Sequence, residues 1–211
     1  MKKILLISLV SFSAFSQTSN IFEPIDVFDL EYVSNTQISS NGDKVLYQRN
    51  FNDIMTDESF SNIWLIDYDG TNNRPITTGN FKDNSPKWSN KGDKFIFKSN
   101  REGKSQIFLY DLNNNSIQKL TNFQNSIEST QWSPDDNYIL FSSFIDSERD
   151  TLIEMPDKPK GAKWNDPPVE ISDLNYRYDS SGFRKPGEVQ FFTIPINGGT
   201  PRQISNIKPE K

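Results

Sequence analysis

The sequence contains no cysteine and no histidine among its 211 residues. Without cysteine, the chain has no disulfide, no thiolate nucleophile and no thiolate metal ligand. Without histidine, it cannot assemble a Ser-His-Asp triad or a histidine-ligated metal site. We therefore expect no catalytic residue, no metal and no cofactor within this chain.

Long apolar runs are also scarce, and the clearest one lies at the N-terminus. Two lysines precede the apolar run 4–10, and the small residues of Ala14-Phe15-Ser16 follow it. This order is typical of a secretory signal peptide, here residues 1–16. A single membrane anchor is the alternative, but the run is too short to span a bilayer. We expect 17–211 to be secreted across the inner membrane to the periplasm or beyond, with no membrane contact after cleavage.

Basic residues are outnumbered, with 23 lysines and arginines against 28 aspartates and glutamates. A net charge of -5 makes nucleic acid a poor partner, because phosphate binding needs a basic surface. Aromatic residues are plentiful at 13%, led by sixteen phenylalanines. Disordered chains are poor in such residues, so this composition indicates a folded domain.

One phrase occurs three times in the chain. Its clear copies are Trp88–Phe97 and Trp132–Phe141, which start 44 residues apart, and a weaker copy is Ile38–Tyr47. A repeat period in the forties is typical of propeller blades. Internal repetition therefore predicts the architecture before any other signal does.

The second copy shows how one repeat folds. Strand 94–99 places Phe95 and Phe97 on one face and Ile96 on the other, so both faces are apolar. That pattern favours a strand between two neighbouring sheets. Strands at 106–111 and 116–120 follow after turn residues. The repeat therefore predicts a four-stranded antiparallel meander, which is one propeller blade.

The repeats divide residues 17–211 into three predicted blades, about 37–78, about 82–122 and about 127–206. The third contains an insertion at about 145–187, because its last strand arrives some 40 residues late. Three blades make an incomplete ring with two bare apolar faces. We therefore expect the isolated chain to associate or to pack loosely.

The blade text resembles the TolB-type PD40 propeller repeat. The residues that carry the resemblance are Trp132-Ser133-Pro134-Asp135, Ser99-Asn100-Arg101-Glu102-Gly103 and Leu120-Thr121. The resemblance implies an all-β fold, a β-propeller of the six- to eight-bladed TolB-like type. About three of its blades would lie in this chain.

A narrower resemblance rests on the leading segment Phe28–Ser34 and on the insertion, notably Lys163–Pro168. These segments resemble the N-terminal propeller of prolyl oligopeptidase family (S9) serine peptidases, especially the acylaminoacyl-peptidase-like branch. The resemblance implies a C-terminal α/β-hydrolase domain that holds the nucleophile, acid and histidine. It also implies oligopeptide substrates, to which the propeller limits access. The chain has no G-x-S-x-G, so no catalytic residue is transferred to it.

Two other functions remain as alternatives. The main one is a periplasmic TolB-like propeller that serves as a protein-binding scaffold and has no catalytic domain. The PD40 text fits both readings, whereas the third-blade insertion and the leading segment favour the peptidase. A carbohydrate-active propeller enzyme is disfavoured, because such sites usually recruit histidine or metal ligands.

The insertion also holds the candidate contact residues. Trp164, Arg177 and Arg184 are our candidates for a substrate entrance or for contacts with another domain, although solvated loop charges are the favoured reading of the two arginines. Trp64, Trp88 and Trp132 recur at blade registers, which favours packing over ligand stacking. The segment 67–72 has a glycine at the wrong position for a calcium loop, so we predict a hairpin turn there.

Overall fold

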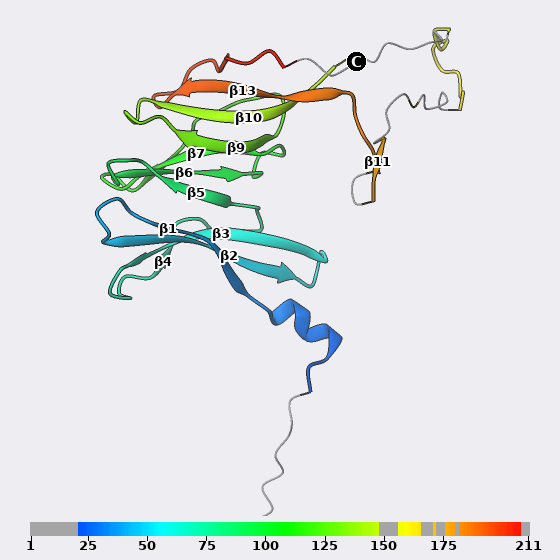
Figure 1. The fold of residues 1–211 in the computed structure, drawn as a ribbon. Helices are drawn as coiled ribbons and strands as arrows, with labels where there is room; N and C mark the ends of the chain where they lie inside the picture. The colour runs from blue at the N-terminus through cyan, green and yellow to red at the C-terminus, as the bar shows by residue number, and fades with distance from the viewer. Residues whose placement is uncertain (1–20, 148–155, 166–170, 172–175, 180–181, 208–211) are drawn as a thin grey trace, which may run out of the picture.

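The computed structural model describes residues 21–147, 156–165, 171, 176–179 and 182–207. Within them, three four-stranded antiparallel sheets stack one upon the next (Figure 1). This arrangement confirms the predicted all-β propeller fold, with three blades that form an open arc. The predicted signal peptide, 1–16, lies outside the described residues. No helix in the described part of the chain is long and apolar enough to cross a bilayer.

Neighbours in each sheet follow chain order, so every blade is a simple meander. The first blade consists of β1 (Tyr32–Ile38), β2 (Lys44–Asp53), β3 (Glu58–Asp67) and β4 (Arg74–Pro75). The second consists of β5 (Asn84–Trp88), β6 (Lys94–Ser99), β7 (Gln106–Asp111) and β8 (Ser116–Lys119). The third consists of β9 (Ile127–Trp132), β10 (Tyr138–Asp146), β13 (Gly187–Pro195) and β14 (Arg202–Gln203). Between β10 and β13, the insertion contains the small hairpin of β11 (Arg177–Tyr178) and β12 (Gly182–Phe183).

The serine of the repeated phrase closes the first hairpin of every blade. The hydroxyl oxygens of Ser39, Ser89 and Ser133 accept hydrogen bonds from the main-chain N–H five residues later, at 3.0, 3.2 and 2.9 Å. The turn also needs a residue with positive φ, which is Gly92 (φ 73°) in the second blade and Asp136 (φ 58°) in the third. The spacing of residues that recurs in the phrase is therefore the spacing that one hairpin turn requires.

The phrase Leu-Thr has a similar local role at the outer strand. Thr77, Thr121 and Ser205 each accept a hydrogen bond from a main-chain N–H of the third strand, at 2.9, 2.9 and 2.7 Å. A side chain thus continues the pairing where the short outer strand stops. In the first two blades the hydroxyl satisfies an N–H group, that of Ile63 or Ile107, which would otherwise be buried without a partner.

Two apolar clusters join the blades, one on each side of the second blade. We call the contact between the first and second blades the first joint, and that between the second and third the second joint. Phe95 and Phe97 face the first joint, whereas Ile96 faces the second, as the sequence predicted. The first joint contains Leu46, Ile63, Leu65, Phe95, Phe97, Phe108 and Tyr110. The second contains Ile96, Ile107, Leu109, Leu120, Ile127, Trp132, Ile139, Phe141, Phe192 and Ile194.

The other face of the first blade has no sheet against it among the described residues. Tyr47 stacks on Trp64 there, with ring centroids 6.1 Å apart, and the Arg49 guanidinium lies 5.6 Å from the Trp64 ring. Trp64 is therefore half-buried on an outward face, whereas Trp132 is buried between blades as the packing prediction requires. Association of the isolated chain through such faces stays a prediction.

Candidate functional site

The first strands of the blades lie next to one another along one edge of the stack. β1 contacts β5 there. Trp88 Nε1 donates a hydrogen bond to the Gln37 oxygen at 3.0 Å, and Trp132 Nε1 donates to the Lys87 oxygen at 2.9 Å. The tryptophan of the repeated phrase thus ties each of these blades to the first strand of the blade before it. We call this edge, from which the blades fan out, the inner edge.

A hollow of about 450 Å³ lies along the inner edge. The residues that line it include Trp88, Trp132, Gln131 and Lys87. None of the residues described as lining it is an aspartate or glutamate. Such walls can stack on a ligand and exchange hydrogen bonds with it, but they supply no pair of groups for acid–base catalysis.

A second feature precedes the first blade. The short 3-10 helix η1 (Pro24–Asp29) packs beside β2. Proline at its first position presets φ, and the Asp26 carboxylate accepts a hydrogen bond from the Glu23 N–H at 2.8 Å. Asn52 Nδ2 from β2 donates to the Val27 oxygen at 2.8 Å, which fixes the helix against the β2–β3 hairpin.

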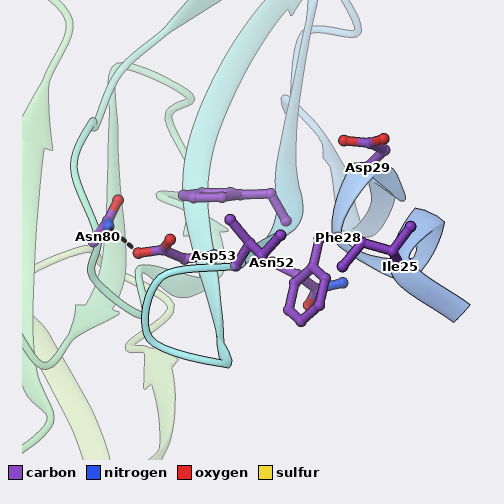
Figure 2. A pocket seen from close by; sticks show the side chains of 8 residues that line it. Ile25, Phe28, Asp29, Asn52, Asp53 and Asn80 are labelled. Atoms are coloured by element: carbon purple, nitrogen blue, oxygen red, sulfur yellow. Dashed lines mark hydrogen bonds between the residues drawn. The ribbon is translucent and has the colours of Figure 1, made fainter.

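A hollow of about 340 Å³ lies between η1 and the tip of that hairpin. Ile25 and Phe28 come from the helix, and Phe28 lies beside Asn52 (Figure 2). On the far side, Asn80 Nδ2 donates to an Asp53 carboxylate oxygen at 3.0 Å. The helix side of the hollow therefore combines apolar side chains with the Asp29 carboxylate, and the side toward the second blade is polar.

Several apolar side chains before the first blade and at the tip of the β2–β3 hairpin are exposed to solvent. No residue of η1 is buried, and at the hairpin tip Met55 is 87% exposed. We call the exposed apolar residues here the docking surface: Ile21, Phe22, Ile25, Val27, Leu30, Ile54 and Met55. Contiguous exposed apolar side chains mark interaction sites. The sequence carried a signal for it, six apolar residues within 21–30 that follow neither helix nor strand periodicity.

The three predicted contact residues all lie in the insertion. Arg177 and Arg184 belong to one small hairpin, because Arg177 pairs with Phe183 and the Arg184 N–H bonds the Tyr176 oxygen at 2.8 Å. Arg184 also lies 3.7 Å from a Glu188 carboxylate oxygen. Trp164, in a separate stretch, is 45% exposed. Their role in a substrate entrance stays a prediction.

A fully buried carboxylate is a candidate functional group, but the one in the second blade is held in an ion pair. The Asp83 carboxylate is fully buried, and Arg101 Nη2 donates to both of its oxygens at 2.9 Å. The same guanidinium lies 4.9 Å from the Phe108 ring centroid. The segment 67–72 forms the predicted turn, in which the Gly70 N–H bonds the Asp67 oxygen. Among the described residues, the features that could bind a partner are the two hollows and the exposed apolar residues near η1.

The chain is similar to a known protein family and to individual known proteins. The family model described as the TolB beta propeller domain, PD40, matches residues 50–156. The chain is 24% identical over 186 residues to the uncharacterized peptidase YuxL of Bacillus subtilis, a match that covers 88% of this chain and 28% of the relative. It is 27% identical over 144 residues to a TolB homolog of Chlamydia abortus, covering 67% of this chain and 33% of that protein.

Among solved structures, the acylaminoacyl peptidase of Pyrococcus horikoshii matches with a TM-score of 0.64 and 19% identity. That match covers 84% of this chain and 25% of the peptidase, so the chain spans between a quarter and a third of the length of these relatives. The resemblance to an S9 peptidase propeller region is confirmed at this level. With the family model matching half of its residues, the chain belongs to the TolB β-propeller domain family.

Proposed function

We propose that this chain is the propeller part of a secreted serine-type peptidase of the S9 family. In this role it limits the access of oligopeptides to a catalytic domain and performs no chemistry itself. The docking surface is the observation that carries the proposal. Its seven apolar side chains are exposed in the described chain, and a further domain would bury them. The match to about a quarter of a peptidase supports it, since that relative has ample length for a further domain.

The division of labour follows from the residues. A chain without histidine and without G-x-S-x-G leaves nucleophile, base and acid to the α/β-hydrolase domain. The docking surface would bury its apolar residues against that domain, and the stacked blades would form a rigid wall over the active site. A rigid wall admits extended peptides and excludes folded proteins by size. The signal-like residues 1–16 support export to the periplasm or the cell exterior.

The alternative is a periplasmic TolB-like scaffold that binds proteins and has no catalytic domain. It is favoured by one observation, the match of the TolB family model itself to 50–156. Both functions use an exposed docking surface. They differ in what covers it, which is a domain of the same polypeptide in the first case and a separate protein in the second.

The test compares residues 1–211 with the product of the whole reading frame, assayed on aminoacyl and acylaminoacyl chromogenic substrates. We expect no turnover from 1–211 alone. We expect the whole product to hydrolyse acylaminoacyl substrates and to lose activity to a serine-directed inhibitor. An inhibitor-sensitive activity in 1–211, or a whole product without a hydrolase domain, would contradict the proposal.

The docking surface can be tested in the same protein. Met55→Asp, at a side chain that is 87% exposed, should loosen the two domains and speed limited proteolysis between them. Tyr68→Asp is the matched control, because Tyr68 is 78% exposed on the turn at the other end of β3. Equal proteolysis rates for both variants and the unmodified protein would contradict domain docking at this surface.

A further inference from the structure

Two lysines of the second blade reach across the second joint at the inner edge. Lys87 on β5 pairs with Ile96 on β6, and Lys98 lies two residues beyond Ile96 on the same strand. Side chains of paired residues, and of residues two apart on a strand, point to the same face. That face packs on the third blade, since Ile96 belongs to the second-joint cluster. Both ammonium groups therefore enter one joint.

Both lysines find neutral acceptors in the third blade. Lys87 Nζ donates to the main-chain oxygen of Thr130 and, at 3.3 Å, to Gln131 Oε1. Lys98 Nζ donates to the main-chain oxygen of Glu128. Among the described residues, neither ammonium group lies within ion-pair distance of a carboxylate, whereas Lys44, Lys94 and Lys119 do.

The electrostatics of the joint follow from this geometry. Burial lowers the pKa of Lys98, and the positive charge of Lys87 lowers it further, while the Glu128 carboxylate acts in the opposite direction. Two partly buried cations thus repel each other in the joint, and in the described part of the chain Glu128 is the one anion whose charge acts on Lys98. Their charge is incompletely compensated, and an added negative charge would be attracted to the joint.

The joint also contains an unused polar group. The Thr130 hydroxyl is buried, with the residue 4% exposed, and has no hydrogen-bond partner in the described structure. Thr130 pairs with Phe141, whose side chain packs toward the second blade, so this hydroxyl points into the same joint. Buried polar groups normally have a partner, and one without a partner suggests a ligand or water that completes it. The hollow of about 450 Å³ gives access at Lys87 and Gln131.

We propose that Lys87 and Lys98 form a binding site for the carboxylate group of a peptide at the inner edge of the second joint. An ammonium has three N–H donors, and Lys98 uses one of them on the main-chain oxygen of Glu128, so it can donate to a ligand oxygen and keep that bond. The Gln131 amide and the Trp88 and Trp132 indoles would contact the peptide beside its carboxylate. The carboxylate is that of a C-terminus or of an acidic side chain. The choice of a peptide rests on the proposed function.

The experiment measures binding of three peptides to residues 1–211 through tryptophan fluorescence. The peptides are acetyl-trialanine with a free C-terminus, its C-terminal amide, and acetyl-Ala-Glu-Ala amide. We expect the free acid to bind at least about tenfold more tightly than the amide, because charge-assisted hydrogen bonds are the stronger kind. Binding of the Glu peptide would assign the site to acidic side chains as well, and both results support a carboxylate site. Affinity should fall as salt is added.

Variants locate the site. Lys98→Gln and Lys87→Gln should each weaken binding of the free acid about tenfold. Lys104→Gln is the matched control, since Lys104 also donates to a main-chain oxygen, that of Gln124, but does not line the hollow. Near-UV circular dichroism shows whether each variant is folded. If Lys98→Gln fails to fold, the affinity of Lys87→Gln, at the more accessible lysine, decides whether the carboxylate site exists.

Equal affinity for the acid and the amide would overturn the proposal, as would unchanged binding in a folded Lys87→Gln variant. These outcomes are separable from those of the peptidase assay. Absence of binding with an active whole product would remove only the carboxylate site. Binding without any peptidase activity would remove only the proposed function.

Discussion

The two joints repeat one backbone geometry with different side chains. In both, an indole bonds a first-strand carbonyl of the preceding blade. The second blade turns aromatic residues, such as Phe95 and Phe97, toward the first joint and the aliphatic Ile96 toward the second. The comparison teaches that main-chain contacts set the spacing of the blades. The side chains packed between the blades can then vary as long as their total volume is conserved.

The crossing between blades shows the same rule more sharply. The Asp83 N–H bonds the Ser61 oxygen at 2.9 Å, and 44 residues later the Ile127 N–H bonds the Ser105 oxygen at 3.0 Å. The ion pair of Asp83 with Arg101 in the second blade corresponds to Ile127 and Ile145 in the third, again 44 residues later. A charged pair in the second blade and two isoleucines in the third thus occupy positions that are equivalent in the repeat.

The largest effect should come from the joint cores. Phe95 and Ile139 are repeat equivalents, fully buried in the first and second joints respectively. We expect Phe95→Ala to lower the free energy of unfolding by about 4 kcal/mol and Ile139→Ala by about 3 kcal/mol, because the larger side chain leaves the larger cavity. Urea melts measure both. Ile117→Ala on β8, at a side chain 39% exposed, is the control and should cost below about 1 kcal/mol. A larger loss at Ile139 would reverse the ranking of the joints.

The next effect concerns the ion pair. Asp83→Asn should cost about 3 kcal/mol, since it leaves the Arg101 charge without its partner. The double variant Asp83→Ile with Arg101→Ile copies the third-blade solution. It should unfold within about 2 kcal/mol of the unmodified chain, the remainder reflecting the lost contact of Arg101 with aromatic rings. If the double variant is less stable than Asp83→Asn, the two crossings are not equivalent.

A smaller effect is expected at the turns. An added Cβ on Gly92 would lie 2.8 Å from the Ser40 hydroxyl, at a φ of +73° that disfavours side chains. Gly92→Ala should therefore cost about 1–2 kcal/mol, and Ser40→Ala should restore part of it by removing the contact but leaving the backbone strain. At the second joint, Asp136 instead accepts hydrogen bonds from the Asn90 and Lys91 N–H groups, at 2.8 and 3.0 Å. Thermal melts measure this. If Ser40→Ala restores no stability to the Gly92→Ala variant, the whole loss comes from backbone strain.

The smallest effect is the contribution of the third-blade turn to the pH dependence of stability. The Ser133 hydroxyl, at 2.6 Å, and then the Asn137 side chain lower the pKa of Asp135 from 3.8 to about 2. The folded state thus favours the ionised form, so this contribution is present above pH 3.8 and is lost as pH falls toward 2. Asp135→Asn should flatten the melting temperature between these pH values relative to the unmodified chain. An unchanged acid profile would show that the turn does not contribute to acid unfolding.

Much of the fold could be predicted because it depends on local patterns. Strands 94–99 and 106–111 were predicted with the observed bounds, and alternation alone gave Phe95 and Ile96 their opposite faces. Repetition supplied the number of blades. These features are encoded within a few residues of one another, at the period of a strand or of a turn.

The sites could not be predicted in the same way, because they depend on residues far apart in sequence. Lys98 contacts Glu128, 30 residues on, and Lys87 contacts Gln131, 44 residues on. At the equivalent place in the first blade, 50 residues earlier, Gln48 accepts a hydrogen bond from the Ser85 N–H at 3.4 Å. In the sequence, Gln48 and Lys98 are two unrelated polar residues. Their equivalent positions become apparent only in the stacked blades. Helix η1 was missed because its apolar residues face solvent and show no period.

The indole bonds between blades have a direction. Trp88 and Trp132 each donate backward, to a carbonyl of a strand that precedes them in the chain, and the first blade has Ile38 in place of the donor. A ribosome delivers the acceptor before the donor, so both of these indoles meet a finished partner as they emerge. Vectorial synthesis can therefore lay down this stack one blade at a time, because neither joint depends on an indole bond to a strand that has yet to be made.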